Sequence, residues 1–185
     1  MIIAVMSDSH DNIWNLREAL AIIKKRNAEM IIHCGDFIAP FTLGELDQGG
    51  IPVHGVFGNN DGDKYLLTKF SLTSLTNVTL YDPVGLVDTD GFKIAFTHHG
   101  IVGEGLAAVG KFNLVCFGHS HKYYFKKNER TILLNPGEIM GKDGLPSFCL
   151  VDTNTGNVEK IELKKAGSCR QKMKKMHLDI QKYAI

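Results

Sequence analysis

The chain lacks the features that mark membrane proteins, disulfide-rich proteins and strongly basic nucleic-acid-binding proteins. None of its apolar runs approaches the length of about 20 residues that a membrane-spanning helix needs. The 21 Lys and Arg residues nearly balance the 20 Asp and Glu residues, so no overall excess of charge favours nucleic acid. The four cysteines contain no CxxC pair and lie far apart, which favours free thiols in a reducing compartment.

What charge there is has an uneven distribution. From Lys160 onward the chain has eight Lys and Arg residues against two acidic residues, which leaves the preceding part acidic. An acidic body suits the binding of a cation, whereas a basic tail suits an anion or a partner. The apolar residues 1–6 are too few for a signal peptide and have no basic region before them, so we expect a cytoplasmic protein.

The patterning divides the chain into one domain over residues 1–165 and a basic amphipathic helix over 166–185. In the first third, apolar runs at 2–6, 30–34 and 53–57 alternate with helical patterns, which predicts a parallel βαβ arrangement. The later part has many short strand-like runs and turn signals, which predict a β-rich half built from antiparallel hairpins. In the tail, apolar residues at spacings of three and four predict a helix that packs on the domain or on a partner.

Five short polar segments each follow an apolar, strand-like run. They are Asp8-Ser9-His10, Gly35-Asp36, Gly58-Asn59-Asn60-Asp61, Thr97-His98-His99-Gly100 and Gly118-His119-Ser120-His121. Because the ends of parallel strands meet at one edge of a sheet, we expect these segments to form one site. A sixth segment, Asn135-Pro136-Gly137-Glu138, reads mainly as a turn, although Glu138 could also hydrogen-bond a ligand histidine.

The polar segments offer seven metal ligands of mixed nitrogen and oxygen type: Asp8, His10, Asp36, Asn59, His98, His119 and His121. Seven ligands are too many for one tetrahedral zinc ion but suit two metals that share a carboxylate. Mixed ligation of this kind suits Mn, Fe, Zn, Ni or Co better than Ca or Mg. Two such metals favour the hydrolysis of phosphate esters, because they generate hydroxide near neutral pH and neutralise phosphoryl charge.

The ordered set of motifs resembles the calcineurin-like metallophosphoesterase superfamily. The short chain and the Asn135-Pro136-Gly137 turn resemble the small bacterial and archaeal phosphodiesterase branch of that family. The resemblance implies an α/β fold, a four-layer sandwich of two mixed β-sheets flanked by helices. It also implies a metal-dependent phosphodiesterase that hydrolyses phosphoester bonds through a binuclear metal centre and a metal-bridging hydroxide.

The resemblance assigns each ligand to one of two divalent metal ions. The first would be held by Asp8, His10, Asp36 and His121, and the second by Asp36, Asn59, His98 and His119, so that Asp36 bridges them. We expect manganese, with Ni, Fe, Zn or Co as alternatives. The expected partner is a small phosphodiester substrate, without a membrane or strong nucleic-acid affinity, and a homo-oligomer is left open.

One position departs from the family pattern. Many members have a histidine after the ligand asparagine, where this chain has Asn60. Asparagine cannot donate a proton at a useful pKa, although its amide can hydrogen-bond a phosphoryl oxygen. His99, next to the expected ligand His98, is a substitute acid, so the catalytic candidates are Asp36, Asn60 and His99. This departure favours diesters with good leaving groups.

Several alternatives stay open at this point. The chain could be a non-catalytic metal-binding scaffold or a protein-interaction module of the same fold, but it has all seven ligands. Asp61 either caps the following helix or orients Asn59. His33, inside a strand, is expected to be packed or to support the site rather than to be a ligand.

Overall fold

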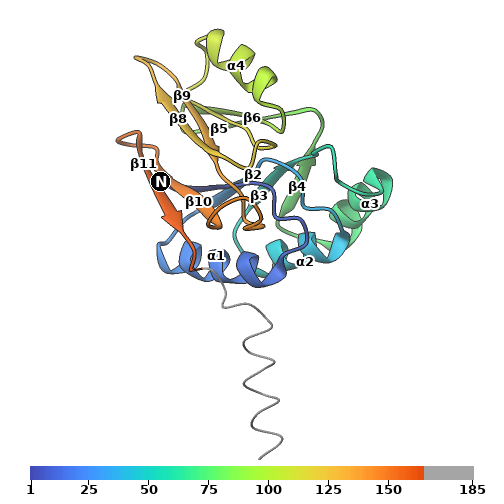
Figure 1. Cartoon of the computed structure of the whole chain (residues 1–185). Coiled ribbons are helices and arrows are strands. Elements are labelled where there is room, and N and C mark those ends of the chain that lie inside the picture. Colours follow the sequence, from blue (N-terminus) through green and yellow to red (C-terminus); the bar gives the residue numbers. More distant parts are fainter. Residues whose placement is uncertain (165–185) are drawn as a thin grey trace, which may run out of the picture.

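A computed structural model describes residues 1–164 of the protein, and the helix expected over 166–185 lies outside the described residues. The described part has eleven strands and four helices in four layers (Figure 1). The α/β sandwich expected from the motifs is therefore confirmed. Within residues 1–164 no helix is long and apolar enough to cross a bilayer.

The first sheet has six strands in the order β11-β10-β1-β2-β3-β4. Their bounds are Ile2–Met6 (β1), Met30–His33 (β2), Val53–Val56 (β3), Val78–Tyr81 (β4), Ser147–Asp152 (β10) and Asn157–Glu162 (β11). The strands β1 to β4 run parallel to one another, whereas β10 pairs antiparallel with β1 and β11 antiparallel with β10. This sheet therefore combines the early and the last strands of the described chain.

The second sheet has five strands in the order β5-β6-β7-β9-β8. Their bounds are Val84–Thr89 (β5), Phe92–Thr97 (β6), Leu114–Cys116 (β7), Tyr123–Lys127 (β8) and Ile132–Pro136 (β9). The expectation that this half consists of antiparallel hairpins is wrong in its centre, because β6, β7 and β9 run parallel. A helix crosses over between β6 and β7, and β8 reverses the chain before β9.

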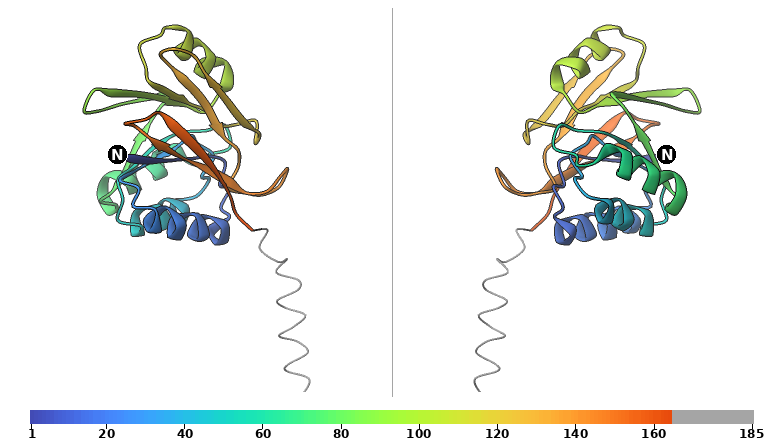
Figure 2. Two further views of the ribbon diagram at one scale, coloured as in Figure 1. Left: turned by 90° about the vertical axis from the view of Figure 1, so that its left-hand side faces the viewer. Right: turned by 90° about the vertical axis from the view of Figure 1, so that its right-hand side faces the viewer.

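Helices cover the outer face of each sheet (Figures 1 and 2). The helices α1 (Ile13–Lys25), α2 (Pro40–Gln48) and α3 (Lys64–Ser74) lie against the first sheet, and α4 (Gly100–Ala108) lies against the second. Asn12 caps α1, because its side chain accepts a hydrogen bond from the Asn15 amide. The residue that caps α3 is Asp63 rather than Asp61, because the Asp63 side chain accepts a hydrogen bond from the Leu66 amide.

The alternation of side chains along β1 explains how the first sheet packs against a layer on each of its two faces. Ala4 and Met6 face the core beneath the helices, whereas Ile3 and Val5 face the core between the two sheets. Both faces of this central strand are therefore buried and apolar, as is typical of a parallel sheet covered on both sides. The polar segments that follow the strands are left at the sheet edge.

Candidate metal centre

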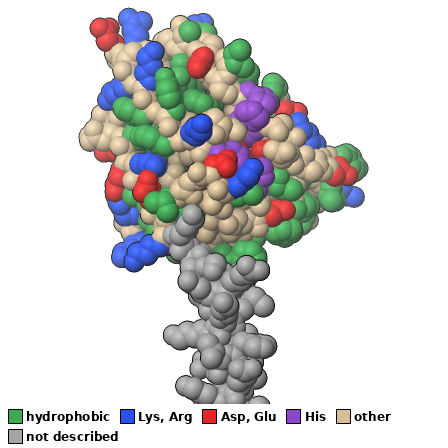
Figure 3. Space-filling view, in the orientation of Figure 1, with side chains coloured by type: hydrophobic (Ala, Val, Ile, Leu, Met, Phe, Trp, Pro, Cys, Tyr) green, Lys and Arg blue, Asp and Glu red, His purple; other side chains and the backbone are tan. Residues whose placement is uncertain are grey.

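The polar segments at the ends of β1, β2 and β3 meet those after β6 and β7 at one edge of the sandwich. Backbone hydrogen bonds hold neighbouring segments together, from the Asp8 amide to the Gly35 carbonyl and from the Gly118 amide to the His98 carbonyl, both at 3.0 Å. Histidine side chains gather at one place on the surface beside charged groups (Figure 3). The site thus receives residues from both sheets.

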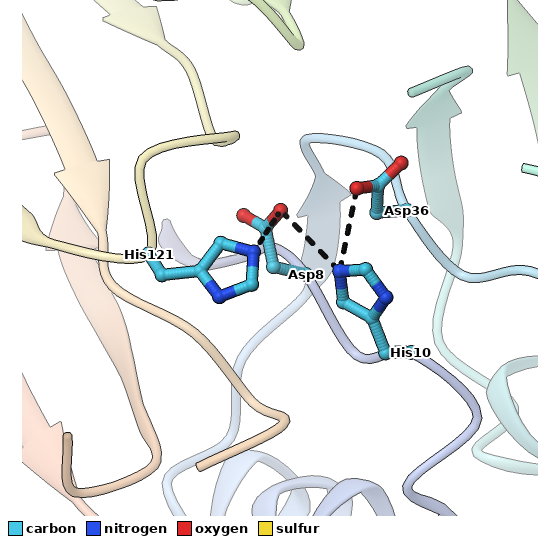
Figure 4. A group of neighbouring side chains, drawn as sticks. All are labelled: Asp8, His10, Asp36 and His121. Carbon is cyan, nitrogen blue, oxygen red and sulfur yellow. Dashed lines mark ion pairs between the residues drawn. The ribbon is translucent and has the colours of Figure 1, made fainter. Parts of the chain in front are cut away.

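A first group of ligands consists of Asp8, His10, Asp36 and His121 (Figure 4). One ligand atom from each of the four lies within 4.8 Å of all the others. His10 Nε2 is 3.3 Å from Asp36 Oδ2, and His121 Nε2 is 3.4 Å from Asp8 Oδ1. The four side chains therefore converge on a space about the size of one cation.

A second group surrounds the Asn59 side chain. Its Oδ1 lies 2.9 Å from His98 Nε2 and 2.7 Å from His119 Nδ1. Asp36 Oδ2 is 3.6 Å from His98 Nε2, so the Asp36 carboxylate touches both groups. The structure thus brings together all seven expected ligands in the two sets that the family resemblance implies.

Two buried ligand atoms have no hydrogen-bond partner. Asp8 Oδ1 and His10 Nε2 are both inaccessible to solvent and both face the first group. A buried polar atom without a partner destabilises a fold by about 1–3 kcal/mol. A divalent cation would satisfy both atoms, so the donor set fits a metal.

Burial and hydrogen bonds set the protonation of the ligands. Burial raises the pKa of Asp8 to about 6. Burial acts in the same direction on Asp36, but the nearby His10 ring and the hydrogen bonds from Asn60 outweigh it and hold the pKa of that carboxyl well below its usual range. Burial lowers the pKa of His98, which keeps its ring neutral. A carboxylate and a neutral imidazole are the forms that bind metals.

The backbone at the ligands is unusual. Five ligand residues have left-handed φ angles: Asp8 (53°), His10 (40°), Asp36 (58°), His119 (68°) and His121 (59°). Non-glycine residues rarely adopt this conformation, and it persists only where the surroundings enforce it. Strained residues of this kind cluster at functional sites in proteins.

Two glycines are required beside the ligands. Gly35 has a φ of +95°, and a Cβ atom there would lie 2.8 Å from His98 Nδ1. A Cβ atom on Gly118 would lie 1.9 Å from Ser7 Oγ and 2.8 Å from Asp8 Oδ2. These glycines allow the segments from the two sheets to approach one another.

Carboxylates behind the ligands fix their positions. Asp61 accepts hydrogen bonds from the backbone amides of Asp36, Gly58 and Ile38, so it supports the Asp36 segment. Glu138 lies 2.8 Å from His121 Nδ1, which leaves His121 Nε2 directed at Asp8. The sequence suggested the Glu138 contact as one of two alternatives but gave no signal for Asp61 beneath Asp36.

The other two catalytic candidates lie at the exposed side of the site. Asn60 donates from its backbone amide to Asp36 Oδ1 and from Nδ2 to Asp36 Oδ2, each at 2.8 Å. His99 is exposed at the start of α4, and its ring centroid is 4.8 Å from that of His119. His98, in contrast, is almost completely buried among the ligands.

Known proteins are similar to this chain in sequence and in fold. A family model of the calcineurin-like phosphoesterase superfamily domain matches residues 1–156. A phosphodiesterase from Methanocaldococcus jannaschii is 32% identical over 166 residues, which make up 88% of this chain and 99% of the relative. These matches extend over nearly all of the described residues.

Solved structures are similar over the same region. An archaeal phosphodiesterase has a TM-score of 0.80 at 32% identity, covering 88% of this chain and 100% of that chain. A phosphoesterase from Escherichia coli has a TM-score of 0.63 at 15% identity, covering 89% of this chain and 100% of its own. The second likeness shows a common fold alone.

Proposed function

The chain belongs to the calcineurin-like phosphoesterase superfamily and is a phosphoesterase, and from this premise we propose that it hydrolyses phosphodiesters at a two-metal centre. The observation that carries the proposal is the Asp36 carboxylate, which lies between the two ligand groups. Two bound divalent cations would supply hydroxide near neutral pH and neutralise the charge of the phosphoryl oxygens. We propose manganese as the metal, with Ni, Fe, Zn or Co as alternatives.

The ligand residues would do two things in this reaction. Their carboxylate, amide and imidazole groups hold both cations at one edge of the sandwich, where a small diester can reach them. The Asp36 carboxylate would contact both cations, which together would supply the charge stabilisation that displacement at phosphorus requires. Both ligand groups would therefore depend on Asp36.

We propose that Asn60 is a positioning residue in this site and that His99 is the proton donor. Both donor groups of Asn60 bind Asp36, so its contacts orient that carboxylate. His99 is exposed beside His119, where its ring can reach a leaving group. An imidazole can donate a proton near neutral pH, which an amide cannot.

The proposed metal centre is tested on a diester with a good leaving group. The assay is the hydrolysis of an activated aryl phosphodiester by metal-free protein, with and without added Mn²⁺. We expect turnover that requires the metal. Absence of turnover with two Mn²⁺ ions demonstrably bound would instead support a metal-binding scaffold. Absence of binding for Mn²⁺ and for each of the alternative metals would refute the metal centre.

The role of His99 is tested by the variant His99→Ala. We expect little change with a nitrophenolate leaving group, which needs no proton, and a loss of about 10²-fold with an alkoxide leaving group. Asn128→Ala, on an exposed turn remote from the ligands, is the control. Equal rates for His99→Ala and wild type on the alkoxide substrate would exclude His99 as the acid.

A further inference from the structure

A fully buried histidine lies beneath the candidate metal centre and is not a ligand. His33 is the last residue of β2 and has no exposed surface. Its Nδ1 accepts a hydrogen bond from the Gly35 amide at 3.2 Å, and its Nε2 is 3.1 Å from Ser9 Oγ. One imidazole therefore contacts both the Asp8-Ser9-His10 segment and the Gly35-Asp36 segment.

The hydrogen bond from Gly35 determines the tautomer of His33. Because Nδ1 accepts, the ring proton resides on Nε2, which donates to Ser9 Oγ. Burial lowers the pKa of His33 to about 3, so the ring is neutral near neutral pH. The ring also packs against Phe37, with centroids 5.3 Å apart, which fixes its plane.

We propose that His33 is a positioning residue that locks the two ligand segments after β1 and β2 in register; the inference rests on the proposed metal centre. Both segments have left-handed backbone at ligand positions, so they need support from their surroundings. Ser9 lies between Asp8 and His10, and Gly35 directly precedes Asp36. Displacement of either segment would therefore move ligands of the first group.

The geometry makes the expected effect selective. The two segments supply Asp8, His10 and Asp36, which are three of the four residues in the first group. The second group receives only Asp36 from them, because Asn59, His98 and His119 come from other segments. Loss of His33 should therefore weaken the first metal site far more than the second.

The variant His33→Phe replaces the imidazole with an apolar aromatic ring and so removes both hydrogen bonds. Titration of the metal-free protein with Mn²⁺ by calorimetry should show two sites in the wild type. In His33→Phe we expect the affinity of one site to fall about 10- to 100-fold, as for other groups that orient metal ligands. We expect the other site to change by less than about threefold.

Two partial variants separate the two contacts. Asn places an oxygen near the position of Nδ1 and can accept from Gly35, whereas Gln places an amide near Nε2 and can donate to Ser9. We therefore expect His33→Asn and His33→Gln each to recover part of the affinity that His33→Phe loses. Val151→Ala, which removes buried side-chain atoms of β10 in the core between the sheets, is the stability control and should leave both affinities unchanged.

The outcomes distinguish this inference from the proposed function. A wild type that binds neither Mn²⁺ nor any of the alternative metals refutes the metal centre itself. A wild type with two sites and a His33→Phe variant with the same two affinities refutes the role of His33 alone. Equal weakening of both sites, matched by Val151→Ala at the same loss of stability, also refutes it, because that result indicates a general loosening of the fold.

Discussion

Asp8→Asn should stabilise the metal-free protein while it weakens the metal-loaded one. Burial raises the pKa of Asp8 from 3.8 to about 6. The folded state therefore binds more protons than the unfolded state between these values, and the contribution of Asp8 to stability falls as the pH rises through that range. Asn has nearly the same shape, cannot ionise, and can still accept from the His119 amide, which bonds Asp8 Oδ2 at 3.1 Å.

The magnitude follows from the two pKa values. Their difference corresponds to about 3 kcal/mol of destabilisation above about pH 7, where the carboxyl is ionised in both states. Asp8→Asn should therefore be about 2–3 kcal/mol more stable than wild type in EDTA at about pH 8. At about pH 4 the advantage should fall below about 1 kcal/mol, because the wild-type carboxyl is then mostly protonated in the folded state.

Urea unfolding followed by circular dichroism measures both differences, in EDTA and again in excess Mn²⁺. With metal the order should invert, since a cation present at 1,000 times its dissociation constant stabilises the wild type by about 4.1 kcal/mol, which exceeds the advantage of the variant, and the variant lacks a charged ligand. An Asp8→Asn variant that is no more stable than wild type in EDTA at high pH would refute this account of the site. A stability difference that does not change with pH would refute it as well.

Other perturbations test the same arrangement. Asp36→Ala should abolish hydrolysis of an activated diester in saturating Mn²⁺, because both ligand groups lose a member; full activity would overturn the assignment. Asp61→Ala should lower the free energy of unfolding by about 3 kcal/mol in urea, because three backbone amides lose their acceptor. Gly118→Ala should reduce both stability and Mn²⁺ affinity, since its Cβ would collide with Ser7 Oγ, and an unchanged melting curve would contradict the packing. EDTA should lower the melting temperature of the wild type, and identical scans with and without chelator would argue against coupling between metal and fold.

The sequence predicted the first strands and their ends because these depend on local pattern, whereas the four layers were implied by the family resemblance. Buried runs such as 2–6 and 30–34 correspond closely to β1 and β2, and the polar residues that follow them lie at the sheet edge. The choice of His98 rather than His99 as the metal ligand agrees with the structure, in which His98 is buried and His99 is exposed. Adjacent residues after a strand point in opposite directions, so only one of the two faces the site. Continuous apolar runs and the residues that directly follow them carry this information without any knowledge of the partner strands.

The pairing of strands far apart in the chain could not be predicted from the sequence. The strands β6, β7 and β9 are parallel because α4 connects β6 to β7 and the antiparallel strand β8 connects β7 to β9. The strand pattern in the sequence does not distinguish such connections from hairpins. The two donors of Asn60 and the Asp61 contacts with the Asp36 and Ile38 amides depend on how the Asp36 segment approaches from about 25 residues away in the chain. Such contacts follow from tertiary packing, which local spacing does not encode.

Because the ligands come from both sheets, the two ligand groups are completed only late in the synthesis of the chain. Asp8, Asp36 and Asn59 leave the ribosome well before His119 and His121, and β10 reaches its place beside β1 only after residue 152 has emerged. A nascent chain therefore holds fragments of both ligand groups but completes neither until the second sheet has docked. Binding of a cation at full affinity at the proposed metal centre would therefore require both sheets to be in place, so that the metal would bind late in folding rather than initiate it.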